Sequence, residues 1–285
     1  MKFKKIEKMI NKKQDWLKNN PEEGKIWLKD KKLVDFSSLL YPENVTIISR
    51  LLNLNKDYID LFQNISETVA ANVVVNNSQF HDYFPQFHNN VKFYLKIISY
   101  YEHASEAVYK KYRSNFFNIV PENIAKNPDF IEQLLWDYTT ANDTSNTINA
   151  FSYYCAIYPE DYIKSTQNYI KKNFRKPIIN DIYVSLNKIG TIVKDVFSKD
   201  FCDELRQIAK QKALSDLKKI NEKFKSHSIS NSQALNCAQN INDNYKEIKK
   251  TINSVDESKI KENQIKEKKL VESALNNLEE EIEKD

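Results

Sequence analysis

The sequence predicts an all-α protein, and three observations carry this prediction. The 285-residue chain contains only two glycines, Gly24 and Gly190, where an average chain of this length has roughly twenty. Apolar residues recur at helical spacings of three and four, and most of the seven prolines stand where a helix would begin. The expected architecture is a multi-helix bundle or short irregular solenoid, followed by a long, coiled-coil-like antiparallel helical hairpin.

Residues 1–33 form the first predicted region, a basic amphipathic N-terminal helix and a connector. Apolar side chains alternate with lysines over residues 4–19, and Pro21 should end the helix. Such a helix could rest on an anionic membrane with Trp16 and Leu17 inserted, as a peripheral contact. The alternative, which we favour, is that it docks on the body of the protein.

Residues 34–176 form the second region, an aromatic-rich helical domain of six to eight helices. The three consecutive valines from Val73 to Val75 are expected to end a helix of residues 56–75, because an isolated strand would lack partners. Proline or polar capping signals mark the expected helix starts at Pro42, Asn55, Pro85, Pro121, Pro128, Asp143 and Pro159.

Residues 177–285 form the third region, a long helical hairpin with a charged C-terminal tail. Its first arm should begin after Pro177, and the polar segment Ser226 to Ser232 should be the turn. The two arms are expected to meet along their apolar seams, and both could also support self-association. The seam residues are Ile182, Leu186, Ile189 and Val193 on one side and Ile241, Tyr245, Ile248 and Ile252 on the other.

The tail continues the helical pattern with Val271, Leu275, Leu278 and Ile282, and its acidic end is expected to be solvated.

Charge is distributed unevenly along the chain. Lysine and arginine exceed aspartate and glutamate by 6 in residues 1–33 and by 8 in residues 166–255. Acidic residues are in excess by 6 in residues 34–165 and by 4 in residues 256–285. Lysine far outnumbers arginine, whereas phosphate and base recognition prefers the planar arginine fork, so a nucleic-acid partner is not expected.

The segment from His81 to His88, HDYFPQFH, is the candidate partner-binding site. Phe84 and Phe87 flank Pro85, whose fixed φ would stiffen the segment and present two aromatic anchors at low entropic cost. The alternative is ordinary packing of these rings inside the helical domain. Two histidines do not make a metal site, and only His103 stands nearby, so no metal is expected.

An enzymatic function is not favoured, and no cofactor or catalytic residue is assigned. The sequence has no GxSxG, HExxH, paired CxxC or phosphate-binding glycine loop. A catalytic site would have to assemble in three dimensions from residues such as His81, His88, His103 and Cys155.

The sequence therefore favours a non-enzymatic protein-protein interaction module whose helical domain binds a partner protein. A cytoplasmic adaptor, or a bacterial or parasite effector secreted without a signal peptide, would have these features, because no secretory signal or transmembrane run is present. The alternative is a nucleotide-exchange regulator of a small GTPase, in which Asp143 would reach the partner's nucleotide site. Asp143 also fits the simpler role of a helix N-cap.

Overall fold

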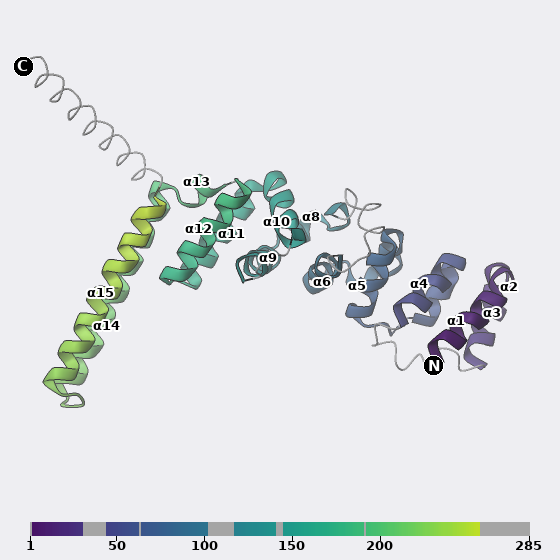
Figure 1. Ribbon diagram of the computed structural model, residues 1–285, viewed down its shortest axis with the longest axis horizontal. Helices are drawn as coiled ribbons and strands as arrows, with labels where there is room; N and C mark the ends of the chain where they lie inside the picture. The colour runs from purple at the N-terminus through teal and green to yellow at the C-terminus, as the bar shows by residue number, and fades with distance from the viewer. Residues whose placement is uncertain are drawn as a thin grey trace, which may run out of the picture. The chain divides into compact units, whose positions relative to one another are not determined.

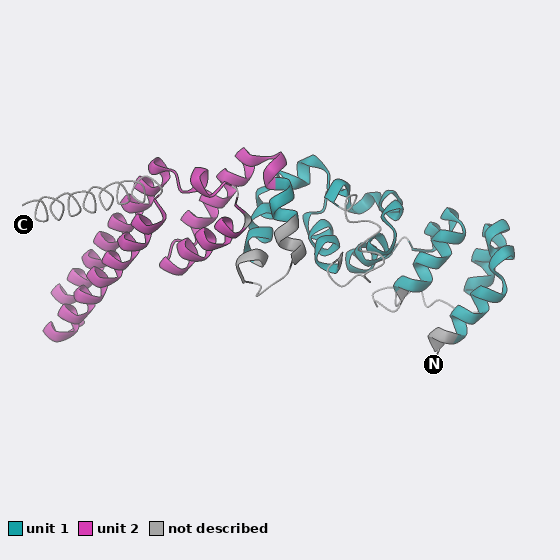
Figure 2. Cartoon of the chain, turned by 45° about the horizontal axis from the view of Figure 1, so that its top comes forward, with its two compact units in different colours: residues 1–154 teal, residues 155–285 magenta. Residues whose placement is uncertain are grey.

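The computed structural model describes residues 2–30, 44–62, 64–101, 117–140, 145–190 and 192–256 (Figure 1). Regular structure within these ranges is helical, with no strand, which confirms the all-α prediction. The chain divides into two compact units, residues 1–154 and residues 155–285 (Figure 2). The finer division predicted after residues 33 and 176 stays a prediction.

Unit 1 contains α-helices and several short 3₁₀ helices, which are labelled η. Their bounds are α1 (Lys2–Lys12), α2 (Gln14–Asn19), α3 (Pro21–Asp30), α4 (Asn44–Leu54), η2 (Lys56–Phe62), α5 (Glu67–Asn76), η3 (Ser78–Tyr83), η4 (Pro85–Phe87), α6 (Val91–Tyr101), η5 (Phe117–Ile119), α8 (Glu122–Ala125), α9 (Pro128–Thr140) and most of α10 (Ser145–Ile157).

The N-terminal helices pack against α4 and η2. The Tyr58 hydroxyl of η2 donates a 2.8 Å hydrogen bond to the main-chain oxygen of Leu17. The ammonium group of Lys25 forms ion pairs of 2.7 Å with Asp60 and 2.6 Å with Glu22. The predicted single helix of residues 4–19 is instead two helices, with a break at Lys13.

Helix α5 lies between α4 and α6 and supplies much of the core of unit 1. It begins at the N-cap Ser66, whose hydroxyl accepts a hydrogen bond from the Val69 amide. The three valines from Val73 to Val75 lie at its C-terminal end, as the sequence predicts, and all three are buried. The predicted helix of residues 56–75 is divided into η2 and α5.

Within its described residues, unit 2 contains the end of α10 and five further helices. Gly190 adopts φ 64° and Ile192 adopts φ 40°, so the chain turns where the apolar periodicity predicts that one long arm continues. The first arm of the hairpin therefore begins at Lys199 and not after Pro177. The helices are α11 (Pro159–Lys172), α12 (Lys176–Ile189), α13 (Val193–Val196), α14 (Lys199–Lys225) and α15 (Asn231–Val255).

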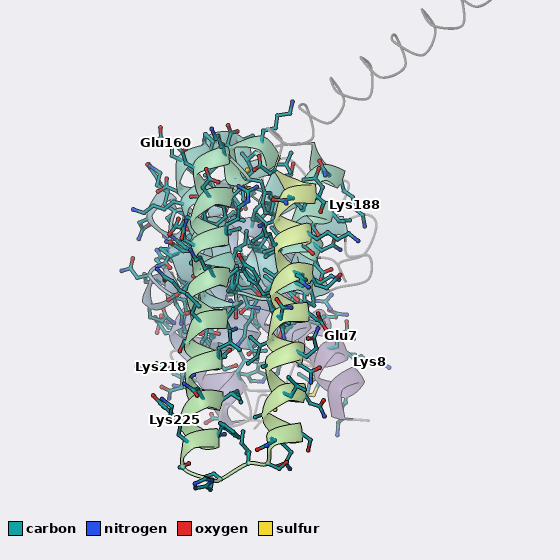
Figure 3. The ribbon with its side chains drawn as sticks, turned by 90° about the vertical axis from the view of Figure 1, so that its left-hand side faces the viewer. Glu7, Lys8, Glu160, Lys188, Lys218 and Lys225 are labelled. Carbon is teal, nitrogen blue, oxygen red and sulfur yellow. The ribbon has the colours of Figure 1, made fainter. Side chains whose placement is uncertain are left out.

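Helices α14 and α15 pack side by side as the predicted antiparallel hairpin (Figure 3). The Ser198 hydroxyl caps α14 by accepting from the Phe201 amide. Ser230 and Gln233 exchange two hydrogen bonds in a capping box that begins α15. Helix α12 also packs against α15, and the Lys176 ammonium lies 2.7 Å from the Glu247 carboxylate.

No helix among the described residues combines the length and the apolar composition that crossing a bilayer requires.

Candidate functional site

The segment His81 to His88 folds back on itself so that its two histidine rings stack. Their centroids are 4.2 Å apart and their planes are inclined by 4°. Nε2 of His81 lies 2.9 Å from the Tyr94 hydroxyl. Nε2 of His88 donates a 3.0 Å hydrogen bond to the main-chain oxygen of His81. The Nε2 atoms of both histidines therefore have partners, one within the segment and one at Tyr94 of α6.

Burial lowers the pKa of His81 below its ordinary value of 6.5, and the adjacent His88 lowers it further. The Asp82 carboxylate, 3.3 Å from Nδ1, opposes this shift. Burial also raises the pKa of Tyr94 to about 12. Among the described residues there is no group of three or more histidine, cysteine or acidic side chains arranged to hold a metal ion.

The two phenylalanines of this segment occupy different environments. Phe84 is fully buried in the core of unit 1, which corrects the expectation of a ring presented on the surface. The reason is the local turn, since the residues on both sides form 3₁₀ helices that direct Phe84 inward. Phe87 is half-buried and stacks on Phe93 at 5.3 Å between centroids. Partner binding by the rest of the segment stays a prediction.

The candidate membrane residues lie against the protein. Leu17 is fully buried. Trp16 is half-buried, with its ring edge-on to Trp27 at 6.2 Å, and the ammonium of Lys13 lies 4.3 Å from its centroid. This arrangement supports docking of the N-terminal helices on unit 1, and a membrane contact stays a prediction.

The remaining sequence candidates are not assembled into a site. Asp143 and His103 lie outside the described residues. Cys155 is fully buried in unit 2. Both alternative functions therefore stay predictions.

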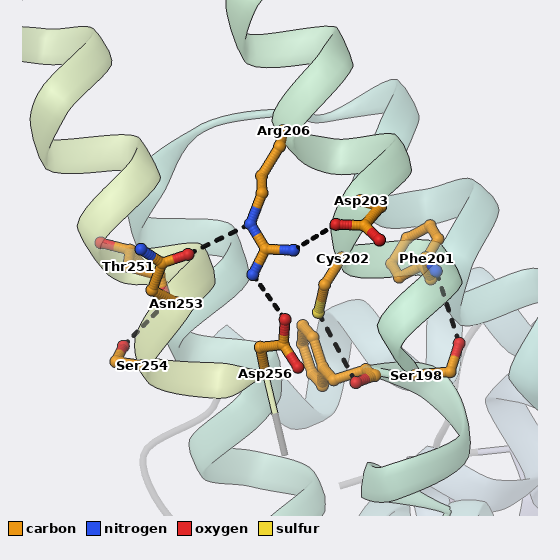
Figure 4. Close-up of polar contacts among 10 residues, drawn as sticks. Ser198, Phe201, Cys202, Asp203, Arg206, Thr251, Asn253, Ser254 and Asp256 are labelled. Carbon is orange, nitrogen blue, oxygen red and sulfur yellow. Dashed lines mark hydrogen bonds and ion pairs between the residues drawn. The ribbon is translucent and has the colours of Figure 1, made fainter. Parts of the chain in front are cut away.

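The hairpin has a well-anchored base, where α14 begins and α15 ends (Figure 4). The guanidinium group of Arg206 binds the carboxylate of Asp256, which is fully buried. It also lies 2.6 Å from Asp203 and donates a 3.1 Å hydrogen bond to Asn253. Apolar residues of both helices are buried at the same level, among them Leu205 and Ile252.

Burial along the hairpin decreases from this base towards the turn. Large apolar side chains in its distal half are exposed to solvent by 56% for Leu214, 36% for Leu217, 40% for Phe224 and 72% for Leu235. Exposure of four large apolar residues within one short stretch marks a candidate interaction surface, since such patches are uncommon on soluble proteins.

Three of these residues, Leu217, Phe224 and Leu235, line an open groove between the two helices, which we call the distal groove. On α14, positions 214, 217, 221 and 224 are spaced by three and four residues and therefore lie on one face. On α15, positions 231, 235 and 238 follow the same rule. The apolar lining consists of Leu217, Ile220, Phe224, Ala234, Leu235 and Ala238.

The surroundings of the distal groove are basic. Residues 210–240 contain six lysines against two acidic residues, Asp216 and Glu222. Lys210, Lys218 and Lys225 are exposed on the side of α14 that carries Leu214 and the distal groove. Figure 3 labels Lys218 and Lys225 on the distal half of α14. The groove therefore favours an apolar ligand that carries negative charge.

On its opposite face, the middle of the hairpin contacts the rest of unit 2. Phe174 is buried there against α14 and α15, beside a small cavity of about 40 Å³ that Ala213 and Tyr245 also line. Within the described hairpin, the groove side of the distal half is where exposed apolar residues and the basic rim occur together. The seam periodicity in the sequence indicates that these residues need a partner helix, but it does not indicate that one face would remain exposed.

Comparisons with protein-family models, with curated proteins and with solved structures give no match for this chain.

Proposed function

We propose that this protein is a non-enzymatic protein-protein interaction module that binds an amphipathic helix bearing acidic residues in the distal groove. The observation that carries the proposal is the exposed apolar stripe along α14 and α15 with its lysine rim. A third helix laid between two others buries its apolar face as in a coiled coil. The expected partner surface is thus on the hairpin, and not at Phe84.

The chemistry of the groove limits what it can bind. Six of its eight lining residues are apolar and only Asn221 and Asn231 are polar, so the groove suits an apolar surface better than a small polar molecule. An open groove with leucine and phenylalanine side chains suits recognition of residues spaced i, i+3, i+4 and i+7 on one helix face. The lysine rim would accelerate association with an acidic helix and make binding weaken as salt rises.

The test is binding of a designed, fluorescein-labelled acidic peptide with leucines at helical spacing, measured by fluorescence anisotropy with the full chain. We expect saturable binding, and no binding of a peptide with the same composition in scrambled order. Leu235→Asp should weaken binding at least about tenfold, because burying a leucine contributes about 1.5–3 kcal/mol and 1.4 kcal/mol corresponds to tenfold.

The matched control is Asn240→Asp, which adds the same charge to the same helix at an exposed position away from the groove. Binding to this variant should be nearly unchanged. Equal loss in both variants would mean that charge alone governs binding. Equal binding of the designed and the scrambled peptide would show that the groove does not recognise leucines at helical spacing.

A further inference from the structure

The residues that follow the hairpin have the chemistry that the distal groove favours. The sequence after Asp256 contains 29 residues, outside the described part of the chain. Val271, Leu275, Leu278 and Ile282 are spaced by four, three and four, so they would share one face of a helix. Residues 272–285 contain six acidic residues and one lysine, a charge opposite to that of the groove's rim.

The position of Asp256 fixes where this segment starts. Arg206 holds the buried Asp256 carboxylate at the base of the hairpin (Figure 4). Helix α15 has 25 residues, which corresponds to about 37 Å at about 1.5 Å per residue. As a helix, the 29 following residues would extend about 43 Å, enough to return from the base to the turn.

The apolar parts of the two segments fall at the same level if the tail runs antiparallel to α15. Helices have the same rise per residue, so residues equally distant from Asp256 lie side by side. Leu235 stands 21 residues before Asp256, and Leu278 stands 22 residues after it. A connecting loop of about three residues would shift Leu278 relative to Leu235 by less than one turn of a helix.

The polar residues of α15 and of the tail also lie at similar distances from Asp256. Towards the base, the groove side of α15 carries Asn242, Lys246 and Asn253, all exposed. The first part of the tail, residues 257–269, is correspondingly polar, with isoleucines only at 260 and 265. The change from polar to apolar therefore occurs at about the same distance from Asp256 in both segments.

We propose that residues 270–282 bind as a helix in the distal groove of their own chain, antiparallel to α15. The tail would then occupy the surface that a partner helix uses, so the tail and a partner would compete for the distal groove. Its regulatory meaning rests on the proposed function, whereas the contact itself does not. A second copy of the hairpin fits less well, because two lysine rims would be brought together.

The first test is thiol cross-linking in the full chain, with Cys237 replaced by serine because it is the one cysteine that is not fully buried. Asn221→Cys places a thiol in the groove lining, and Ala274→Cys places one at the border of the tail's apolar face. A short bismaleimide should join them within one chain, at monomer mass. The control pair replaces Asn221→Cys by Glu222→Cys, which points away from the groove and should link poorly.

The second test uses the designed acidic peptide as the probe and compares the chain with its Leu275→Asp, Leu278→Asp double variant. A tethered tail competes at an effective concentration of order millimolar, so removing its apolar anchors should raise peptide affinity at least about tenfold. The control, Asn276→Asp together with Asn277→Asp, adds the same charges beside the apolar face and should not raise affinity. Circular dichroism of each variant confirms an unchanged helical content.

The outcomes separate the two proposals. An intrachain link without peptide binding to either chain supports tail docking and overturns the proposed function. If the original chain and the double variant bind the peptide equally well and no cross-link forms, tail docking is overturned and the proposed function stands. A link found only at dimer mass shows that a second copy fills the groove, and overturns docking within one chain.

Discussion

Gly24 stands inside α3, where replacement of a glycine by alanine ordinarily stabilises a helix by up to about 1 kcal/mol. Here the added methyl group would collide with the Tyr58 hydroxyl, which is held by its hydrogen bond to the oxygen of Leu17. We therefore expect Gly24→Ala to destabilise the protein, by about 1–3 kcal/mol, because overpacking forces the phenol or the helix to move.

Urea denaturation followed by circular dichroism measures this change. Tyr58→Phe combined with Gly24→Ala should recover part of the loss, since the clash is with the hydroxyl oxygen. A Gly24→Ala protein as stable as the original would show that α3 does not lie this close to η2.

His81 gives the stability of the protein a pH dependence whose sign follows from its lowered pKa. The unfolded chain takes up a proton near pH 6.5, before the folded protein does. Stability from keeping His81 neutral is therefore complete above this pH and is lost as the pH falls below it. We expect the free energy of unfolding to decrease between pH 7 and pH 5.

The substitution His81→Gln should remove part of that decrease in urea titrations at the two pH values. His227, which is exposed in the turn of the hairpin, provides the matched control. If His227→Gln flattened the pH dependence as much as His81→Gln, the histidine stack would not be its source.

Helix α15 combines two environments within one element. Ile252 is fully buried at the base of the hairpin, whereas Leu235 is largely exposed near the turn. We expect Ile252→Ala to cost about 2–5 kcal/mol, as for other buried aliphatic residues, and Leu235→Ala to cost less than about 0.5 kcal/mol. Thermal unfolding of both variants tests this difference, and equal costs would contradict the gradient of burial along the helix.

The starts of several helices could be predicted from the sequence because local chemistry determines them. Pro128 and Pro159 each begin a helix, and the serine-rich turn separates α14 from α15, as predicted. The break between α12 and α14 could not be predicted from periodicity, because the apolar spacing continues through it. Gly190 was the one local signal, and the left-handed backbone of Ile192 has none in its residue type.

The candidate site was less predictable than the elements for the same reason. Spacing shows that Leu217 and Leu235 lie on helix faces that need apolar neighbours, but not which neighbours cover them. The burial of Phe84 likewise depends on the turn that the chain makes between η3 and η4. Aromatic richness alone does not distinguish a buried ring from an exposed anchor.

The whole chain has three cysteines, and their environments predict its reactivity towards thiol reagents. Cys155 and Cys202 are fully buried, and burial raises the pKa of Cys202 to about 12, with the nearby Asp256 adding to the effect. Cys237 is half-buried on α15. Because the thiolate is the reactive form, we expect one thiol per chain to react quickly with an aromatic disulfide reagent.

In denaturant all three thiols should react, and Cys237→Ser should remove the fast phase in native protein. Two fast thiols in the native chain would contradict the burial of Cys155 or Cys202. The measurement needs only the intact protein and the absorbance of the released thiolate.

Across the whole molecule, composition was sufficient to predict the fold class, because scarcity of glycine and helical spacing both exclude extensive strands. It was not sufficient to find the division after residue 154, which falls inside α10 and not in a linker. Contacts between residues distant in sequence decide such a division, and one sequence does not reveal them.

The loss of burial from the base of the hairpin to its turn also has a kinetic meaning. Peptide hydrogens near Ile252 can exchange with solvent only when a packed region opens, whereas those near Ser230 are held by little more than helical hydrogen bonds and a cap. The outer turns of α14 and α15 can therefore unwind and re-form while the base stays folded. A ligand bound in the distal groove would make the turn and the base of the hairpin unfold together. Slower hydrogen exchange at the turn would then indicate that the ligand is bound.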